Sequence, residues 1–370
     1  MFSSLKNWWA AADTQTALDE VKKIAKSNPK KIIVDAVTLL GTAKCFESHS
    51  IIGNPTLNRL GLHRYRVQKA AHLAAYRREK LAQYLTVDEV EQFQKNGFIL
   101  KENFLEDPVF AALSKELLET PLATRETLQG DTVTRRMALD AESLKKLPTT
   151  HSLINNAKWR ALLNYVGSSK VQPMYYVQVI LSHVRNSKPD PQTNLHSDTF
   201  HPSVKAWLFL TDVAEDEGPF VYAAGSHVVN EKRLDWEYQK SLQMNPKTDA
   251  MTRRGSFRVK AKELEDMGYQ APKAFAVKKN TLVIADTYGF HARGPSVRPS
   301  TRIELWAYGR RSPFLPWVGF DLLSIPVLKS RLIPWYWQAL DFLERKYERK
   351  NPWRKVGNLR ATDPAVITHK

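Results

Sequence analysis

The chain has 370 residues, of which 43% are hydrophobic, and a formal net charge of +17. This hydrophobic share supports a buried core and excludes a chain that is disordered throughout. Its single cysteine, Cys45, excludes an intrachain disulfide and fits a reducing compartment. No apolar run has the length of a secretory signal or of a bilayer-spanning helix. We therefore expect a cytoplasmic protein that is soluble or peripheral to a membrane.

The N-terminal part of the chain is predicted to be helical. Apolar residues recur at helical spacing over residues 14–26 and again over residues 64–85, which are rich in Ala and Leu. A Gly-Asn-Pro stretch at residues 53–55 separates the second helix from the preceding apolar segment. Residues 1–85 are therefore expected to form a helical, basic N-terminal extension.

A new unit is predicted to begin at Thr86. Thr86 and Glu89 have the spacing of a capping box, in which the two side chains satisfy the free N–H groups at the start of a helix. Asn96-Gly97 is a natural helix stop, and residues 98–100 then have the composition of a short strand.

The central part is predicted to form short strands separated by Gly- and Pro-containing turns. This pattern indicates a β-sandwich or jelly roll over residues 86–312. Residues 229–275 are charged and less regular, and are interpreted as a long insertion between core strands. Residues 313–370 form a basic, Trp-rich C-terminal extension with a predicted helix at 335–349. The predicted core strands are 175–181, 206–210, 220–223, 281–286 and 302–308.

The most informative pattern is His196-x-Asp198, followed later by His291 and, 11 residues after that, by Arg302. Two imidazoles and one carboxylate are the ligands of non-haem Fe(II) oxygenases, which leave coordination positions open for a cosubstrate and O₂. On an extended backbone residues i and i+2 point the same way, so His196 and Asp198 can converge on one metal. The alternative is a surface turn with an incidental histidine.

Arg302 is predicted to bind the carboxylate of a cosubstrate, because guanidinium grips a carboxylate with two parallel hydrogen bonds. The strand that ends before His291 and the strand that begins at Arg302 are expected to pair as neighbours across residues 292–300. The alternative for Arg302 is a surface ion pair at the end of a strand.

Several further segments, read together with this pattern, give the chain a family resemblance. It resembles the phytanoyl-CoA dioxygenase family of Fe(II)/2-oxoglutarate oxygenases over roughly residues 87–312. The matching segments occur in family order, and the 11-residue step to the arginine is characteristic. They are residues 91–98 (EQFQKNGF), 194–198 (NLHSD), 210–213 (LTDV), 217–220 (EGPF), 225–227 (GSH) and 291–302.

The resemblance implies a double-stranded β-helix fold with iron held by His196, Asp198 and His291. It implies that Arg302 binds the C5 carboxylate of 2-oxoglutarate, with O₂ as the second cosubstrate. Gln178 falls where relatives often place a polar residue that contacts 2-oxoglutarate. Because the metal carboxylate is present, hydroxylation is favoured over halogenation.

The chain departs from the family pattern at two positions. Arg293 stands two residues after the distal histidine, where the family commonly has a small or hydroxyl residue. It is interpreted either as a contact for an acidic substrate or as an outward-pointing side chain. Ala224 replaces the family's proline before Gly-Ser-His, which affects the geometry of that loop more than its chemistry.

Two more residues are candidates for the substrate site. His201 follows the metal motif and either lines the site or is a plain loop residue. Trp207 either forms a wall of the site or packs in the core.

The positive charge and much of the tryptophan lie at the two ends of the chain. Residues 1–86 carry 14 basic and 6 acidic side chains, residues 301–370 carry 13 and 6, and residues 87–300 carry 28 and 26. Tryptophan clustered with Lys and Arg is typical of an interfacial membrane contact. The alternative is a solvated basic face with tryptophans that pack the terminal helices onto the core. The terminal tryptophans are Trp8, Trp9, Trp317, Trp335, Trp337 and Trp353.

The leading hypothesis is a 2-oxoglutarate-dependent hydroxylase that acts on a small or lipid-linked acidic substrate, with an anionic membrane surface as a partner. A second hypothesis is that the basic ends bind nucleic acid, with the oxygenase fold acting on a nucleobase or serving as a scaffold. No recognised nucleic-acid motif supports this second reading. A third is a metal-binding fold without catalysis.

Overall fold

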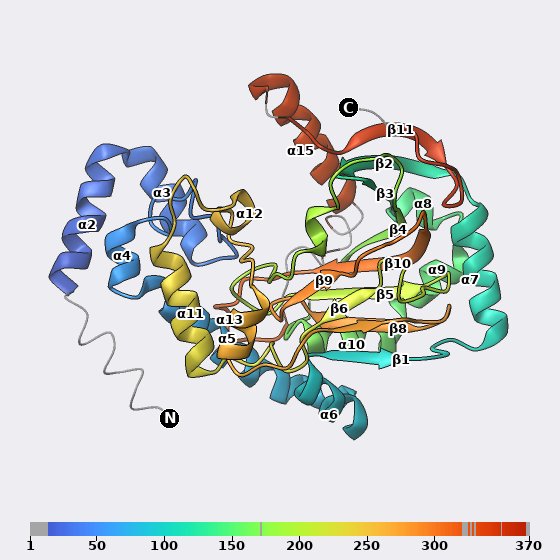
Figure 1. Cartoon of the computed structure of the whole chain (residues 1–370), viewed down its shortest axis with the longest axis horizontal. Coiled ribbons are helices and arrows are strands. Elements are labelled where there is room, and N and C mark those ends of the chain that lie inside the picture. The colour runs from blue at the N-terminus through green and yellow to red at the C-terminus, as the bar shows by residue number, and fades with distance from the viewer. Residues whose placement is uncertain are drawn as a thin grey trace.

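Two antiparallel sheets that face each other form the centre of the protein (Figure 1). A computed structural model describes residues 14–170, 172–319, 325, 328, 331–348 and 350–367, so Trp8 and Trp9 lie outside the described residues. The larger sheet has the order β1-β8-β5-β10-β4-β3-β2-β11 and the smaller one the order β7-β6-β9. This arrangement confirms the predicted double-stranded β-helix.

The five predicted core strands are all present, with ends shifted by one or two residues. Three further strands of the large sheet, β2, β3 and β11, were not predicted. The strands of the large sheet are β1 (Phe98–Lys101), β2 (Leu122–Gln129), β3 (Thr132–Ala138), β4 (Met174–Leu181), β5 (Val204–Phe209), β8 (Leu282–Asp286), β10 (Thr301–Gly309) and β11 (Arg354–Leu359). Those of the small sheet are β6 (Phe220–Tyr222), β7 (Lys273–Phe275) and β9 (His291–Arg293).

The predicted pairing of the strand before His291 with the strand that begins at Arg302 is wrong. β5 lies between them, because Trp207 pairs with Val283 of β8 on one side and with Trp306 of β10 on the other. After β8 the chain crosses to the opposite layer, where His291 in β9 pairs with Tyr222 of β6. From β7 to β10 the chain alternates between the two sheets, so closeness along the chain does not predict closeness within a sheet here.

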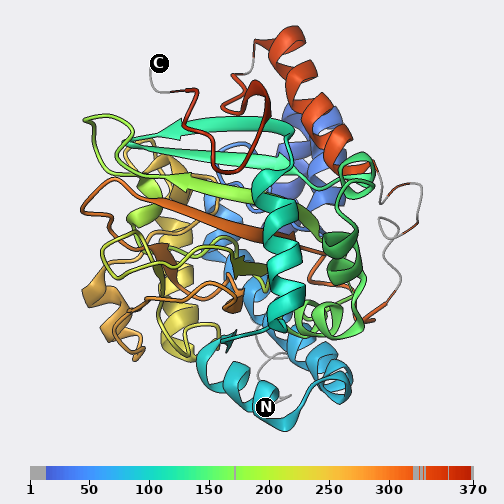
Figure 2. The ribbon, with the colours of Figure 1, turned by 90° about the vertical axis from the view of Figure 1, so that its right-hand side faces the viewer.

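Alternation along each strand divides the core into two faces. Leu305 of β10 belongs to an outer cluster with Leu113 of α7 (Asp107–Glu119) and Trp159 of α10 (Ala157–Val166). Figure 2 shows α7 lying across this side of the sheet. Trp306, the next residue, belongs to an inner cluster between the two sheets that also contains Trp207. The outer face is therefore a packed support, and the inner face holds the aromatic and polar residues of the cavity described below.

The remaining helices lie around the sandwich, some with α7 on the outer face and others at its ends. The bounds of the N-terminal helices are α2 (Thr14–Ser27), α3 (Pro29–Leu39), α4 (Pro55–Arg59), α5 (Leu62–Leu81) and the 3-10 helix η1 (Ala82–Tyr84). The insertion at 229–275 contains α11 (Glu231–Leu242), α12 (Ala250–Arg253) and α13 (Ala261–Asp266), so it is more regular than predicted. The others are α6 (Val87–Asn96), α8 (Ala141–Leu144), α9 (Pro148–Asn155), η2 (Pro191–Thr193) and α15 (Leu332–Tyr347).

The predicted helix start at Thr86 and its stop at Gly97 are confirmed. Thr86 and Glu89 form the capping box, and Gly97 has a left-handed φ of 86°. A β-carbon at Gly97 would lie 2.6 Å from both the His227 ring and the Tyr222 hydroxyl, so this position requires glycine. The same turn accepts a hydrogen bond from the Gly225 N–H at Asn96 O. Segments 91–98 and 225–227 are thus neighbours in space.

The N-terminal helices are tied to the insertion. His63 of α5 lies 2.8 Å from Glu237 of α11, and both side chains are buried. Arg64 forms ion pairs with Glu231 and Asp235 of the same helix. Figure 1 shows these helices gathered at the end of the sandwich away from α7. No helix among the described residues is both long and apolar enough to cross a bilayer. The domain boundaries at 85/86 and 312/313 stay a prediction.

The C-terminal segment is held to the sheet by a buried ion pair. Glu126 of β2 and Arg135 of β3 are both fully buried and lie 2.7 Å apart. Arg135 also donates to the carbonyl oxygens of Asp363 and Pro364, while Glu126 accepts from the backbone N–H of Val366. Because these groups satisfy one another away from water, residues 354–367 are part of the sheet's own packing.

Replacing Glu126 by glutamine should lower the free energy of unfolding by roughly 3–5 kcal/mol, because the Arg135 charge then stays buried without its partner. Chemical denaturation measures the change. The matched control is Glu142→Gln, whose ion pair with Lys145 is exposed and should contribute less than about 1 kcal/mol. Equal effects of the two substitutions would contradict this account.

Candidate metal centre

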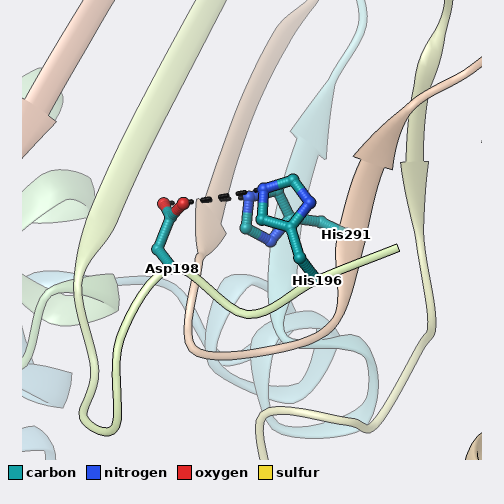
Figure 3. Close-up of side chains that lie close together, drawn as sticks. All are labelled: His196, Asp198 and His291. Carbon is teal, nitrogen blue, oxygen red and sulfur yellow. Dashed lines mark ion pairs between the residues drawn. The ribbon is translucent and has the colours of Figure 1, made fainter. Parts of the chain in front are cut away.

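The structure brings His196, Asp198 and His291 together as predicted (Figure 3). One potential ligand atom of each lies within 4.8 Å of the others. Two reciprocal backbone hydrogen bonds of 2.9 Å join His196 and His291, and the Asp198 N–H donates to Thr287 O. The loop with the first two ligands is therefore fixed against the strand that carries the third.

Hydrogen bonds select the ring nitrogens that face the centre. Nδ1 of His196 lies 2.7 Å from Asn194 O, and Nδ1 of His291 lies 2.9 Å from Gly289 O. A backbone carbonyl only accepts, so each Nδ1 carries the proton and each Nε2 presents a lone pair. Nε2 of His291 is buried without a hydrogen-bond partner. Binding of a metal ion by this nitrogen directly explains why it is buried without a hydrogen-bond partner.

The protonation states suit a divalent metal. Burial lowers the pKa of His291 to about 4, and burial together with the neighbouring His291 lowers the pKa of His196 well below its usual value. Burial alone would raise the pKa of Asp198, but Lys205 and the two imidazoles outweigh it and hold that pKa well below its ordinary range. At neutral pH the set is two neutral imidazoles and one carboxylate, which are the forms that bind metal.

Two lysines that were not predicted reach the metal-binding loop. Nζ of Lys205, on β5, lies 2.6 Å from Oδ2 of Asp198. Lys44, from the N-terminal segment, donates to the backbone carbonyl of Asp198. Since a carboxylate offers about four acceptor positions, Asp198 can bind a metal and Lys205 together. Lys205 lies two residues before Trp207 on the same face of its strand, so strand alternation would have placed it at the site; Lys44 had no such signal.

The three residues line a cavity of about 260 Å³ that also contains Arg302. The Arg302 guanidinium is buried and makes two contacts that the sequence did not reveal. Its Nε lies 2.9 Å from Oε2 of Glu304, a fully buried carboxylate two residues further along β10. Its Nη1 donates to the carbonyl oxygen of Gly218. Of its five N–H donors, at least two remain for a ligand.

Gln178 lies in the same cavity, between two charged neighbours. Its amide Nε2 donates to Glu304 over 2.8 Å, and its Oε1 accepts from Nε of Arg136 over 3.3 Å. Because β4 lies between β3 and β10, Arg136, Gln178 and Glu304 stand side by side in one row across the sheet.

The other predicted site residues divide between the cavity and its surroundings. Trp207 and Arg293 line the cavity. Arg293 is also ion-paired with the buried Asp190. His201 is buried outside the cavity lining, where its Nδ1 donates to Pro202 O and its ring packs on Phe200.

Residues 93–267 match the model of the family described as Phytanoyl-CoA dioxygenase (PhyH). This segment belongs to that family. The match contains His196 and Asp198 and ends before His291, and the structure then supplies His291 and Arg302 through β9 and β10. No curated protein matches the sequence significantly.

Two solved structures are examples of those to which the chain is similar. The α-ketoglutarate-dependent epimerase SnoN from nogalamycin biosynthesis is 16% identical, with 74% of this chain and 94% of that chain covered and a TM-score of 0.41. HygX from Streptomyces hygroscopicus, with nickel and 2-oxoglutarate bound, is also 16% identical, with 65% and 92% covered and a TM-score of 0.40. At these values the assignment depends on the family match and on the geometry of the ligands. Together these identify the protein as an Fe(II)/2-oxoglutarate-dependent oxygenase.

Replacing Asp198 by alanine should weaken Mn(II) or Fe(II) binding by at least about 100-fold, because losing a ligand costs more than losing an outer-shell contact. Anaerobic equilibrium dialysis measures the affinity. Asp212→Ala removes an exposed carboxylate outside the cavity and serves as the control. An unchanged metal affinity in the Asp198 variant would overturn the assignment of this residue as a ligand.

Proposed function

We propose that the protein hydroxylates an unactivated carbon of a small or lipid-linked acidic substrate, using Fe(II), 2-oxoglutarate and O₂. The observation that supports this most directly is the cluster of His196, Asp198 and His291 in one cavity with Arg302. The metal and 2-oxoglutarate supply the oxidising chemistry when bound, with succinate and CO₂ as coproducts, and the protein supplies binding and orientation. A carboxylate as third ligand favours hydroxylation.

Arg302 is proposed to hold the C5 carboxylate of 2-oxoglutarate through its remaining N–H donors. Glu304 and the Gly218 carbonyl contact other donors of the same guanidinium and so fix its orientation. Gln178 donates to Glu304, and we propose that it positions this pair. Such support matters because a catalytic site loses activity when its binding groups are misplaced by about 1 Å.

The charges around the cavity favour an acidic substrate. Arg136, Lys205, Arg293 and Arg302 line it, against the single lining carboxylate of Asp198. Even with Glu304 and Asp190 as ion-pair partners of two arginines, the surroundings of the cavity keep an excess of positive charge. Walls of one sign of charge raise the local concentration of ligands of the opposite sign.

Aromatic side chains form the apolar walls of the same cavity. Trp207 packs against Phe220 with ring centroids 4.7 Å apart, and Trp306 and Trp353 lie on the side of Arg136. These rings give the cavity apolar walls beside the metal ligands, and apolar walls strengthen the electrostatic interactions next to them. Trp207 is thus proposed as a wall of the site as well as a member of the core.

Replacing Arg302 by methionine should raise the 2-oxoglutarate concentration for half-maximal succinate release by about 10- to 100-fold, since two charged hydrogen bonds are lost. The Arg302→Lys variant should need a 2-oxoglutarate concentration between those of the wild-type protein and the methionine variant, because lysine keeps the positive charge but cannot form two parallel hydrogen bonds. Succinate is measured with Fe(II) and a metabolite pool that includes membrane lipids. Arg298→Met, an exposed arginine, is the control. If the wild-type protein releases no succinate under any of these conditions, the proposed function is wrong.

An anionic membrane surface is proposed as a partner of α3. Ile33, Val34, Val37 and Leu40 are between 59% and 70% exposed and follow one another at helical spacing. Lys30 precedes this apolar stripe by one turn and is exposed. An apolar face flanked by lysine is the composition of a helix that lies in a membrane interface. On α15, exposed Trp335 and Phe342 add aromatic area near basic residues.

The double substitution Ile33→Asp and Val37→Asp should reduce flotation with anionic vesicles at low salt by about tenfold or more, because two exposed apolar side chains that would enter the membrane interface are lost. Val87→Asp, at an exposed valine in the first turn of α6, is the control. Wild-type protein should float less with neutral vesicles. Failure of the wild-type protein to float with anionic vesicles would remove this partner.

A further inference from the structure

Arg136 occupies an unusual position on the inner face of β3. Its guanidinium lies 4.3 Å from the ring centre of Trp306 and 4.6 Å from that of Trp353, so two indoles flank it. It lines the same cavity as His196, Asp198 and His291. Cation–π contacts of this kind hold an arginine in place without using its hydrogen-bond donors.

The donors of Arg136 are largely uncommitted. Its Nε contacts Oε1 of Gln178, and within the described part of the chain no carboxylate forms an ion pair with its guanidinium. The other arginines on the inner face differ, because Arg125 pairs with Asp341, Arg293 with Asp190 and Arg302 with Glu304. Arg136 is half-buried, and a guanidinium that has lost part of its water without gaining a carboxylate partner favours a ligand that supplies the negative charge.

We propose that Arg136 binds the anionic group of the substrate, a carboxylate or a phosphate, and thereby selects acidic substrates. This inference rests on the proposed function, in which Arg302 holds the cosubstrate. Arg136 and Arg302 lie on β3 and β10, with β4 between them. Because neighbouring strands are about 4.8 Å apart, their backbones are separated by roughly 10 Å, which leaves room for two different anions.

A chain of contacts links the two arginines. Arg302 contacts Glu304, Glu304 accepts from Gln178, and Gln178 accepts from Arg136. Gln178 therefore lies between the two guanidinium groups. It contacts Arg136 directly and contacts Arg302 through Glu304. Among the described residues no hydrogen bond uses the Nη groups of Arg136, which can therefore donate two parallel hydrogen bonds to a carboxylate or phosphate.

The C-terminal segment completes this anion site. Trp353 is one of the two indoles that flank Arg136, and its backbone is fixed at both ends. Its N–H donates to the side chain of Asn351, and its carbonyl accepts from Arg125. The tryptophan that the sequence placed at a membrane or in terminal packing thus lines the metal cavity.

The test uses the full-length protein loaded anaerobically with Fe(II) and 2-oxoglutarate, titrated by calorimetry with hexanoate, hexyl phosphate and hexanol. The wild-type protein should bind at least one of the two anions, and whichever binds more tightly identifies the kind of acid. Arg136→Met should weaken anion binding at least tenfold, leave hexanol binding unchanged, and change 2-oxoglutarate affinity by less than twofold. Arg298→Met should match the wild-type protein throughout.

Three results would overturn the proposal: no anion binding by the wild-type protein, equal anion affinity in Arg136→Met, or an equal loss of 2-oxoglutarate affinity. Thermal unfolding checks that the variant folds, and Arg136→Gln replaces it otherwise. Failure of the wild-type protein to bind Fe(II) and 2-oxoglutarate contradicts the proposed function. In that event the same anion titration of the metal-free proteins still decides whether Arg136 is an anion site.

Discussion

The reciprocal pair of backbone hydrogen bonds between His196 and His291 is the constraint on which the site depends. It joins a loop that follows β4 to a strand of the opposite sheet, and it brings two imidazoles to ring centroids 4.6 Å apart. Neighbouring hydrogen bonds support this pairing. The Ser226 hydroxyl accepts from the N–H of Phe290, immediately before His291, and the turn at Gly97 supports the loop that carries Ser226. Residues 91–98 and 225–227, which are far apart in sequence, therefore both help to hold His291 in position.

Charge on the inner face is organised by pairing. Most cations there have a carboxylate within ion-pair distance, and these partners come from different elements: Asp341 from α15, Asp190 from the loop before the metal motif, Glu304 from β10. Such pairing keeps the cost of burying charge low and also fixes side-chain orientation. Arg136 differs from these cations, because it lies between two indoles and has no carboxylate partner among the described residues. Its charge is therefore available to an anionic ligand.

The sequence predicted the site better than it predicted the sheet. His196 and Asp198 are two residues apart, and His291 follows a recognisable strand, so local rules were sufficient to group them. The neighbours of β8 and β10 were wrong because strand order depends on how the chain crosses between layers, which periodicity does not encode. β2 and β3 were missed because they contain Thr, Arg and Glu at buried positions, for example the Arg135–Glu126 pair, and so lack an apolar pattern. Lys44 and Trp353 reach the site from the two ends of the chain, and no local signal marks a contact of that range.

The attachment of residues 354–367 to β2 and β3 has a consequence for the order of assembly. Ribosomal synthesis produces the chain from its N-terminus, and domains generally fold in that direction. All three metal ligands and Arg302 have been made some 50 residues before Trp353 and the strand that anchors it. A nascent chain can thus complete the metal-binding pair of sheets while one wall of the cavity is still missing. Closure of that wall is a late event, so there is an interval during synthesis in which the metal ligands are in place and the cavity is still open on the side that Trp353 later covers.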